Sequence, residues 1–502
     1  MEKGVDKGQA ASSSARRMSE IPVDDVKSFK TAKKESLYAD RIRVYPKRVT
    51  GRYRRMKWAV LGVLLAIYYV VPWLRWDRGP GAPDQAVLLD LDGRRAYFLW
   101  IEIWPQEVYY LTGILILAAI GLFLVTSIAG RLWCGYACPQ TVWTDLFMWV
   151  ERVVEGDRNA RIKLDAQPLT VGKAGKKLVK HASWLIIAAL TGGAWIMYFV
   201  DAPTVVREIF AGEASTYTYF FIGLFTATTY LLAGWAREQV CTYMCPWPRF
   251  QASMYDEDTL VVTYQKWRGE PRGKLTKGDE RTGRGDCVDC GQCVAVCPTG
   301  IDIRDGVQLE CIGCGLCIDA CNGVMEKVNL PLGLIGFDTQ RRMEQRGKSE
   351  KLGYRIVRPR TILYALLLIG VAAIMLVSLA TRGSQDISVL HDRAPLFVRL
   401  SDGSIRNGYT IKISNMDRQP RSYQLRIEAL ANANMQIVGE DVARKTEFVL
   451  TAPADQVATY RLYLTVSPGT LRGEQTEFSF VLTNTESKDR TVTRSQFRGP
   501  RP

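Results

Sequence analysis

Histidine is the scarcest of the chemically versatile residues in this sequence, with only His181 and His391 among 502 residues. A membrane haem held by paired histidines needs two on the same side, and a histidine-rich copper site needs more. The membrane topology predicted below places the two histidines on opposite sides, which excludes both kinds of site. We expect His181 to be an interfacial residue and His391 to lie on a surface.

Cysteine is absent after Cys321, so the C-terminal part of the chain can hold neither a disulfide nor a thiolate site. It also lacks clustered histidines and paired carboxylates. Short runs of alternating apolar and polar residues, separated by Gly, Pro, Asn and Asp, are typical of an antiparallel sandwich. These runs predict an immunoglobulin-like β-sandwich over residues 381–502 that acts as a docking module; they are Tyr409–Ile413, Tyr423–Ile427, Thr446–Leu450, Thr459–Leu464 and Glu477–Leu482.

Charge is absent, or nearly so, from five long apolar stretches, and a bilayer core of roughly 30 Å needs about 20 such residues. We therefore predict an α-helical part with five membrane spans: Trp58–Leu74, Val108–Ala129, Ala182–Val200, Tyr217–Ala236 and Thr361–Ala380. No cleavable signal peptide is expected, because the first apolar run starts only near Trp58 and lacks a small-residue cleavage site.

Lysine and arginine are unevenly distributed between the spans. There are 16 in residues 1–57, 9 in 130–181 and 19 in 237–360, against 4 in 75–107 and 1 in 201–216. By the positive-inside rule the basic segments are cytoplasmic. This predicts a basic tail (1–57), a four-helix membrane region (58–236) with a cytoplasmic loop (130–181), a cytoplasmic segment (237–360), a fifth span (361–380) and an outer domain (381–502). The net charge of +15 follows from this asymmetry and indicates acidic lipid, not nucleic acid, as a partner.

Eight cysteines repeat one spacing, C-x2-C-x2-C-x3-C, with the second copy 24 residues after the first. This doubled spacing is typical of two 4Fe-4S clusters, in which the fourth cysteine of each run binds the other cluster. The alternatives are zinc knuckles and a disulfide framework, but zinc would require two pairs of ligands rather than two sets of four at this spacing. The predicted ferredoxin-like domain covers about 280–330, with Cys287, Cys290, Cys293 and Cys321 on one cluster and Cys311, Cys314, Cys317 and Cys297 on the other.

Glycines accompany both cysteine runs. Gly291, Gly313 and Gly315 suit the positive φ angles that a loop wrapped around a cluster requires. The runs differ after the last cysteine, where Pro298 follows the first and Asn322 the second. We expect this difference to leave ligation intact and to separate the potentials of the two clusters.

The remaining four cysteines form two C-x3-C-P motifs, each just after a span: Cys134 and Cys138, then Cys241 and Cys245. The repeat indicates a duplicated helical hairpin. A spacing of i, i+4 places two thiols on one helix face, while the following proline disfavours helix at the second cysteine. Four soft thiolates brought together suit cuprous copper, zinc or an iron–sulfur cluster. The alternative is that they are buried packing residues.

The order of these parts resembles the CcoG family, also called FixG or RdxA, of cytochrome c oxidase accessory proteins. The resemblance runs from about Ser36 to the end of the chain. It implies a multi-pass protein of the bacterial inner membrane that acts in assembly of cbb3-type oxidase by reducing cupric to cuprous copper. It also implies that Cys134, Cys138, Cys241 and Cys245 handle copper. The implied partners are the oxidase or its assembly factors, a copper chaperone or transporter, and a cytoplasmic electron donor.

Two other functions remain open from the residues alone. One is an electron-relay subunit, like the polyferredoxins of nitrate or nitrous oxide respiration, that delivers electrons to a quinone or a flavin. The other is a non-enzymatic assembly factor whose sandwich grips the oxidase while the clusters sense redox state. Copper reduction by the purified protein would separate the three.

Overall fold

The computed structural model describes residues 43–500 except 80, 275–282, 346–352, 440–444, 468–470 and 472. Most of the predicted basic tail therefore lies outside the described residues. The chain divides into two compact units. The first combines residues up to Leu61 with Ala129–Ala188 and Thr228–Leu352, and the second combines Gly62–Ile128, Ala189–Ala227 and Gly353–Pro502.

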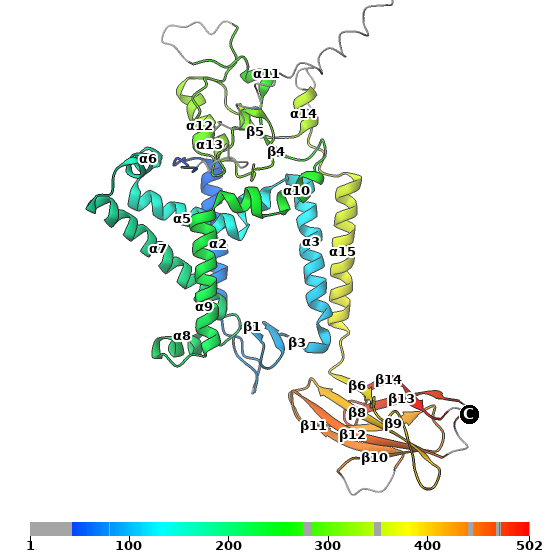
Figure 1. The fold of residues 1–502 in the computed structure, drawn as a ribbon. Coiled ribbons are helices and arrows are strands. Elements are labelled where there is room, and N and C mark those ends of the chain that lie inside the picture. The colour runs from blue at the N-terminus through cyan, green and yellow to red at the C-terminus, as the bar shows by residue number, and fades with distance from the viewer. Residues whose placement is uncertain are drawn as a thin grey trace, which may run out of the picture. The chain divides into compact units, whose positions relative to one another are not determined.

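Four helical segments in the described part of the chain are long and apolar enough to cross a membrane: Arg52–Trp73, Pro105–Ala129, Thr216–Ala236 and Pro359–Ala380. They contain α2 (Arg52–Val70), α3 (Tyr109–Ala129), α9 (Thr216–Thr229) with the π-helix η4 (Tyr230–Ala236), and α15 (Pro359–Ala380) (Figure 1). They match four of the five predicted spans. The protein is therefore a membrane protein.

The fifth predicted span, Ala182–Val200, is not among these four. Its residues belong to α7 (Val171–Ile196), which does form a continuous helix. Four lysines occupy its first half, and Lys180 is buried. The apolar part between Lys180 and the helix end at Ile196 is shorter than the roughly 20 residues that a spanning helix needs. By length and composition, the described part of the chain thus has four helices that could span a membrane, one fewer than the five predicted.

The second unit contains the predicted sandwich. One sheet has the order β10-β12-β8-β6 with β7 beside β8, and the other has the order β11-β9-β13-β14 (Figure 1). Apolar side chains of both sheets, including Tyr409, Leu464 and Phe480, form one buried core. The strands are β6 (Gln385–His391), β7 (Val398–Arg399), β8 (Ile405–Asn415), β9 (Arg421–Glu428), β10 (Ala433–Ile437), β11 (Glu447–Ala452), β12 (Gln456–Val466), β13 (Gln475–Asn484) and β14 (Arg490–Arg498).

His391 lies at the end of β6 in the sandwich. It is half-buried, because its Nε2 lies 2.7 Å from the Asn407 side-chain oxygen and its ring contacts Tyr409 edge-on. Elsewhere in the second unit, α3 packs closely on α15 at Gly113, where a Cβ would meet Met375. A small sheet follows α2, made of β1 (Val87–Asp90), β2 (Arg95–Phe98) and β3 (Ile101–Ile103), and α8 (Ala202–Ala211) precedes α9.

The first unit holds all twelve cysteines. The predicted loop 130–181 is helical: α4 (Leu132–Tyr136), α5 (Pro139–Glu155), α6 (Arg158–Ala166) and the start of α7. The later part contains η5 (Val240–Met244), α10 (Trp247–Ser253), α11 (Lys266–Gly269), α12 (Gln292–Ala295), η6 (Ile303–Asp305), α13 (Leu316–Lys327) and α14 (Gln340–Gln345). A two-stranded antiparallel sheet of β4 (Val261–Tyr264) and β5 (Ile335–Asp338) packs beside α13.

Candidate functional site: two thiol groups beside a pair of repeated membrane hairpins

Glycines shape the loops that carry the eight repeated cysteines. Gly291 has φ 63° immediately before α12, and Gly315 has φ 73° immediately before α13. Gly313 has φ 67° between Ile312 and Cys314. These left-handed angles strain any residue with a Cβ atom, so the predicted role of the three glycines is confirmed.

The structure brings the fourth cysteine of each run to the other run. The pKa of the Cys321 thiol rises to about 12, first through burial and then through the nearby thiols Cys293, Cys290 and Cys287. The pKa of Cys311 also rises to about 12, first through burial and then through Cys314 and Cys297. Two thiol groups result, each made of three cysteines of one run and the last cysteine of the other.

Burial of these thiols matters for what they can bind. Cys287, Cys293, Cys314 and Cys321 are buried, and Cys290 is exposed. Because a buried thiol keeps its proton at neutral pH, a metal centre must displace that proton and supply the compensating positive charge. The donor set therefore fits iron–sulfur clusters: it is all sulfur, it falls into two groups of four, and tight glycine turns surround it.

In both C-x3-C-P motifs, the proline determines the backbone conformation of the cysteine before it. Cys134 lies within α4, but Cys138 is extended, with φ −60° and ψ 127°, just before Pro139 begins α5. Cys245 is extended in the same way, with φ −80° and ψ 121°, after η5 and before Pro246. The predicted effect of proline is confirmed, whereas the prediction that both thiols of a pair share one helix face is wrong. Proline forces the second cysteine out of the helix.

The four thiols of these motifs lie within electrostatic reach of one another. The pKa of Cys134 rises to about 12 through burial and through Cys138, with smaller effects from Cys241 and Cys245. In the described part of the chain, no three Cys, His, Asp or Glu side chains converge closely enough to hold a single metal ion.

The first C-x3-C-P motif packs directly against the second cysteine run. The Tyr136 hydroxyl donates a hydrogen bond to the Cys314 carbonyl at 3.0 Å. A Cβ on Gly135 would lie 2.8 Å from the Ile312 carbonyl oxygen, so only glycine allows this approach. Cys134 packs against the buried cluster that includes Ile312 and Cys314.

Arg131 ties three segments together at the same place. Its guanidinium donates to the carbonyls of Leu309 and Cys311 beside the cluster loop, and to the Pro248 carbonyl in α10 at 2.6 Å. Sequence reasoning missed Arg131, Gly135 and Gln251, whose side-chain oxygen lies 3.2 Å from the Cys134 sulfur. Their contacts are to residues more than 100 positions away, so no local pattern could reveal them.

The beginning of α2 is fixed by the cluster domain. Asp319 in α13 accepts hydrogen bonds from the backbone N–H groups of Tyr53 (3.2 Å) and Arg54 (2.8 Å) in the first turn of α2, where the helix itself supplies no carbonyl acceptor. The Arg54 guanidinium in turn contacts both carboxylate oxygens of Asp145 in α5. These contacts fix the start of the first membrane helix to α13, which carries Cys317 and Cys321, and to α5, which follows the first C-x3-C-P motif.

Comparison with known families agrees with this organisation. A model described as a 4Fe-4S dicluster domain matches residues 236–340, and one described as a 4Fe-4S binding domain matches residues 111–155, which contain Cys134 and Cys138. A model of the IG-like fold at the C-terminus of FixG matches residues 375–500. Together with the apolar helices, these matches define a membrane-bound iron–sulfur protein of electron transfer.

Full-length relatives identify the family. The chain is 52% identical to Protein RdxB of Cereibacter sphaeroides, covering 88% of this chain and 92% of that protein. It is 48% identical to Nitrogen fixation protein FixG of Rhizobium meliloti (92% and 94% covered) and 48% identical to Protein RdxA of Cereibacter sphaeroides (87% and 92%). The chain belongs to the FixG/RdxA family.

Proposed function

We propose that this protein reduces cupric to cuprous copper during assembly of a cbb3-type cytochrome c oxidase. The observation that carries the proposal is the contact between the C-x3-C-P hairpin and the second cysteine run. Tyr136, Gly135 and Cys134 all touch the Ile312–Cys314 segment, so a metal held by the hairpin thiols would lie next to a redox centre held by that run.

The proposed ligand sets follow from the two thiol groups. One cluster is held by Cys287, Cys290, Cys293 and Cys321, and the other by Cys311, Cys314, Cys317 and Cys297. When bound, the clusters supply one-electron redox chemistry; the chain positions them and shields them from water. Cupric ion is the substrate: each ion takes up one electron, and thiolate sulfur favours the cuprous product. The copper-handling thiols are Cys134, Cys138, Cys241 and Cys245.

The proposed setting is the bacterial inner membrane, with the N-terminus and clusters in the cytoplasm and the sandwich in the periplasm; this orientation takes the predicted span Ala182–Val200, most of it in α7, as the fifth crossing. The distribution of lysine and arginine supports this orientation. The proposed partners are a cytoplasmic electron donor, a copper chaperone or transporter, and the oxidase or its assembly factors, which the sandwich would contact.

The test is a single-turnover measurement. Anaerobic protein is reduced with dithionite, desalted, and mixed with cupric ion in the presence of a cuprous chelator. We expect about two cuprous ions per chain, one for each cluster electron, and none when the four hairpin cysteines are changed to serine. Reduced clusters that keep their electrons in the presence of copper would contradict the proposal and favour an electron relay or a redox-sensing assembly factor.

A second candidate for the hairpin thiols is an additional iron–sulfur cluster. The observation that favours it is the family match over residues 111–155, which includes Cys134 and Cys138 within a 4Fe-4S binding domain. Iron analysis of the serine variant, described in the Discussion, distinguishes the two.

A further inference from the structure

Lys57 is a buried lysine inside a segment that is long and apolar enough to span a membrane. It lies on one face of α2 with Arg54 and Leu61, at positions i, i+3 and i+7, and only 2% of its surface is exposed. On the opposite face, Val63 and Val70 are more than half exposed. A lysine within such a segment is rare and commonly marks a functional site.

The ion pair beside Lys57 does not explain why the lysine is buried. Asp145 in α5 already accepts two hydrogen bonds from the Arg54 guanidinium, at 3.0 Å and 2.9 Å. The Lys57 Nζ lies 3.8 Å from the same carboxylate, which is beyond hydrogen-bond distance. The Arg54–Asp145 pair is thus complete without Lys57, and burying a further cation costs free energy.

Lys57 lines a small cavity together with Cys241 of the second C-x3-C-P motif. Pro298, Thr299 and Ile312 line this cavity and also a second one. Among the residues around the second cavity are the four thiols of one predicted cluster, Cys297, Cys311, Cys314 and Cys317. Pro298, Thr299 and Ile312 therefore form a shared wall, with the predicted cluster on one side and Cys241 and Lys57 on the other.

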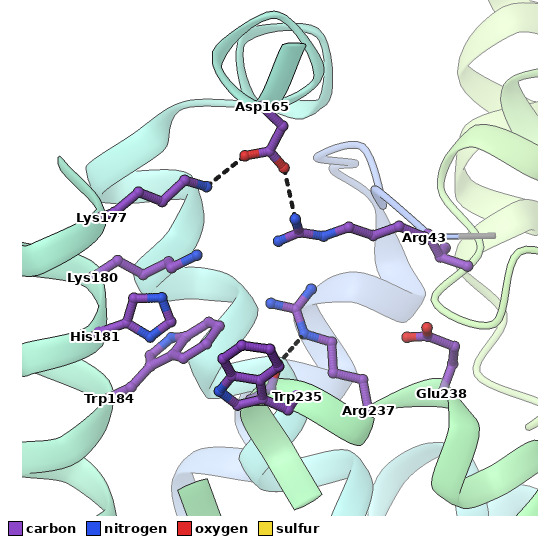
Figure 2. Close-up of a pocket in the computed structure, with 11 residues that line it drawn as sticks. Arg43, Asp165, Lys177, Lys180, His181, Trp184, Trp235, Arg237 and Glu238 are labelled. Atoms are coloured by element: carbon purple, nitrogen blue, oxygen red, sulfur yellow. Dashed lines mark hydrogen bonds and ion pairs between the residues drawn. The ribbon is translucent and has the colours of Figure 1, made fainter. Parts of the chain in front are cut away.

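The other cation of the small cavity, Arg237, is compensated. Its guanidinium is bonded to Glu151, and its Nε donates a hydrogen bond to the Gly234 carbonyl at 2.8 Å. Figure 2 shows this guanidinium directed into a larger neighbouring cavity, beside Trp235. Lys57 is therefore the cation of the small cavity whose charge is available to the shared wall.

The charge of Lys57 acts on both sides of the shared wall. Burial raises the pKa of the Cys314 thiol, and Lys57 opposes this more strongly than Asp145 adds to it. Burial also raises the pKa of Cys241 to about 11; Glu238 adds to this rise and Lys57 opposes it. A cation that stabilises a thiolate also stabilises the extra negative charge of a reduced cluster.

Thr299 contributes a hydrogen-bonding group from within the shared wall. Its hydroxyl oxygen lies 3.3 Å from the Cys297 sulfur. A metal-bound thiolate carries no proton, so the hydroxyl is then the donor and the sulfur the acceptor. Hydrogen bonds to cluster sulfurs help to set the reduction potential, and a donor that stabilises the negative charge raises it.

We propose that Lys57 and Thr299 are positioning residues that raise the reduction potential of the cluster held by Cys311, Cys314, Cys317 and Cys297. The species that moves is one electron, which this cluster gains from the other cluster and gives to cupric ion beside Cys241. No proton moves and no further reactant is needed. The destination of the electron rests on the proposed copper reduction, whereas the potential can be measured without copper.

Three variants of the full chain test the two residues. Lys57→Met removes the charge and keeps the length of the side chain, and Thr299→Val removes the hydroxyl and keeps its shape. Lys327→Met is the matched control, because Lys327 is an exposed lysine of α13, the helix that carries Cys317. Each reconstituted protein is titrated against potential in the absence of copper and followed by EPR. The signal that changes in Cys314→Ser belongs to the cluster of the second run.

In Lys57→Met we expect the reduction equilibrium of the second-run cluster to shift about tenfold toward the oxidised state, which is about 59 mV for one electron. In Thr299→Val we expect a shift of about threefold in the same direction. The potential of the other cluster should shift much less, and the iron content should stay that of the unmodified protein. Lys327→Met should change neither potential, because water and salt screen its charge.

An unchanged second-run potential in both variants, with full iron content, would overturn this role and leave the proposed copper reduction standing. Equal shifts of both clusters, or a shift in Lys327→Met, would also overturn it, because they would reflect a general change of structure. If Lys57→Met loses its iron, Thr299→Val decides, and an unchanged potential there overturns the proposal. Shifted potentials in an unmodified chain background that fails single-turnover copper reduction would overturn the proposed function alone.

Discussion

The Tyr136 hydroxyl hydrogen-bonds to the backbone carbonyl of Cys314 at 3.0 Å. This bond joins the middle of the first C-x3-C-P motif to the middle of the second cysteine run, 178 residues later in the chain. Tyr243 holds the equivalent place in the second motif but is 76% exposed. The two hairpins are therefore repeated in sequence but not equivalent in structure, and the first one supports the cluster loop.

Changing Tyr136 to phenylalanine should lower the free energy of unfolding by about 1 kcal/mol, because the buried Cys314 carbonyl loses its donor. Thermal unfolding of the reconstituted protein measures the effect. Tyr243→Phe is the matched control and should change nothing, since that side chain is exposed. Equal effects of the two variants would argue against an asymmetric pair of hairpins.

Changing Gly135 to alanine should disturb the docking more strongly. The new Cβ would lie 2.8 Å from the Ile312 carbonyl oxygen and 3.0 Å from the Cys314 Cα, and backbone atoms cannot easily move away. We expect a cost of about 1–3 kcal/mol, typical of overpacking, and faster loss of iron to a chelator. Gly172→Ala in α7 is the control, because no atom lies within 4 Å of its added Cβ.

Cluster stoichiometry tests the eight repeated cysteines. Anaerobically reconstituted protein should contain about eight iron atoms and eight sulfides, four of each per cluster. Replacing Cys290 and Cys314 together with serine removes one expected ligand from each cluster and should release most of both elements. About four irons per chain in fully reconstituted protein would contradict two clusters.

Iron analysis also distinguishes the two candidates for the hairpin thiols. With Cys134, Cys138, Cys241 and Cys245 changed to serine, a copper site predicts unchanged iron and lost copper binding, because serine is a harder and weaker ligand for cuprous ion. An additional cluster predicts that the unmodified protein holds about twelve irons and the variant about a third fewer. Unchanged iron content together with unchanged copper binding would indicate that the four residues serve only in packing.

Fusion reporters test the predicted sidedness. A reporter that is active only outside the cytoplasm should be active after Ser384, at the start of the sandwich, and inactive after Gln345, at the end of α14. The expectation follows from the basic segments on the predicted inner side. Activity at both sites would show an even number of crossings between them, and so remove α15 from the spanning helices.

Local rules explain which sequence-based predictions succeeded. Proline restricts the residue before it wherever it occurs, so the extended conformations of Cys138 and Cys245 follow from two residues each. Period-two alternation predicted β8, β9, β11, β12 and β13, because alternate side chains of these strands point into the core of the sandwich. Strands β6, β7, β10 and β14 were missed.

The sequence by itself determined the composition of the centre: eight cysteines at ferredoxin spacing, two C-x3-C-P motifs and apolar helices to carry them, because these depend on neighbours along the chain. Only the tertiary structure decided why Gly135 and Tyr136 matter, and that α7 buries Lys180 against Glu155. The same holds for a cavity of about 300 Å³ that is lined by residues as distant as Arg43 and Arg237. Such contacts depend on how separated segments pack, and packing over that distance leaves no periodic signal in the sequence.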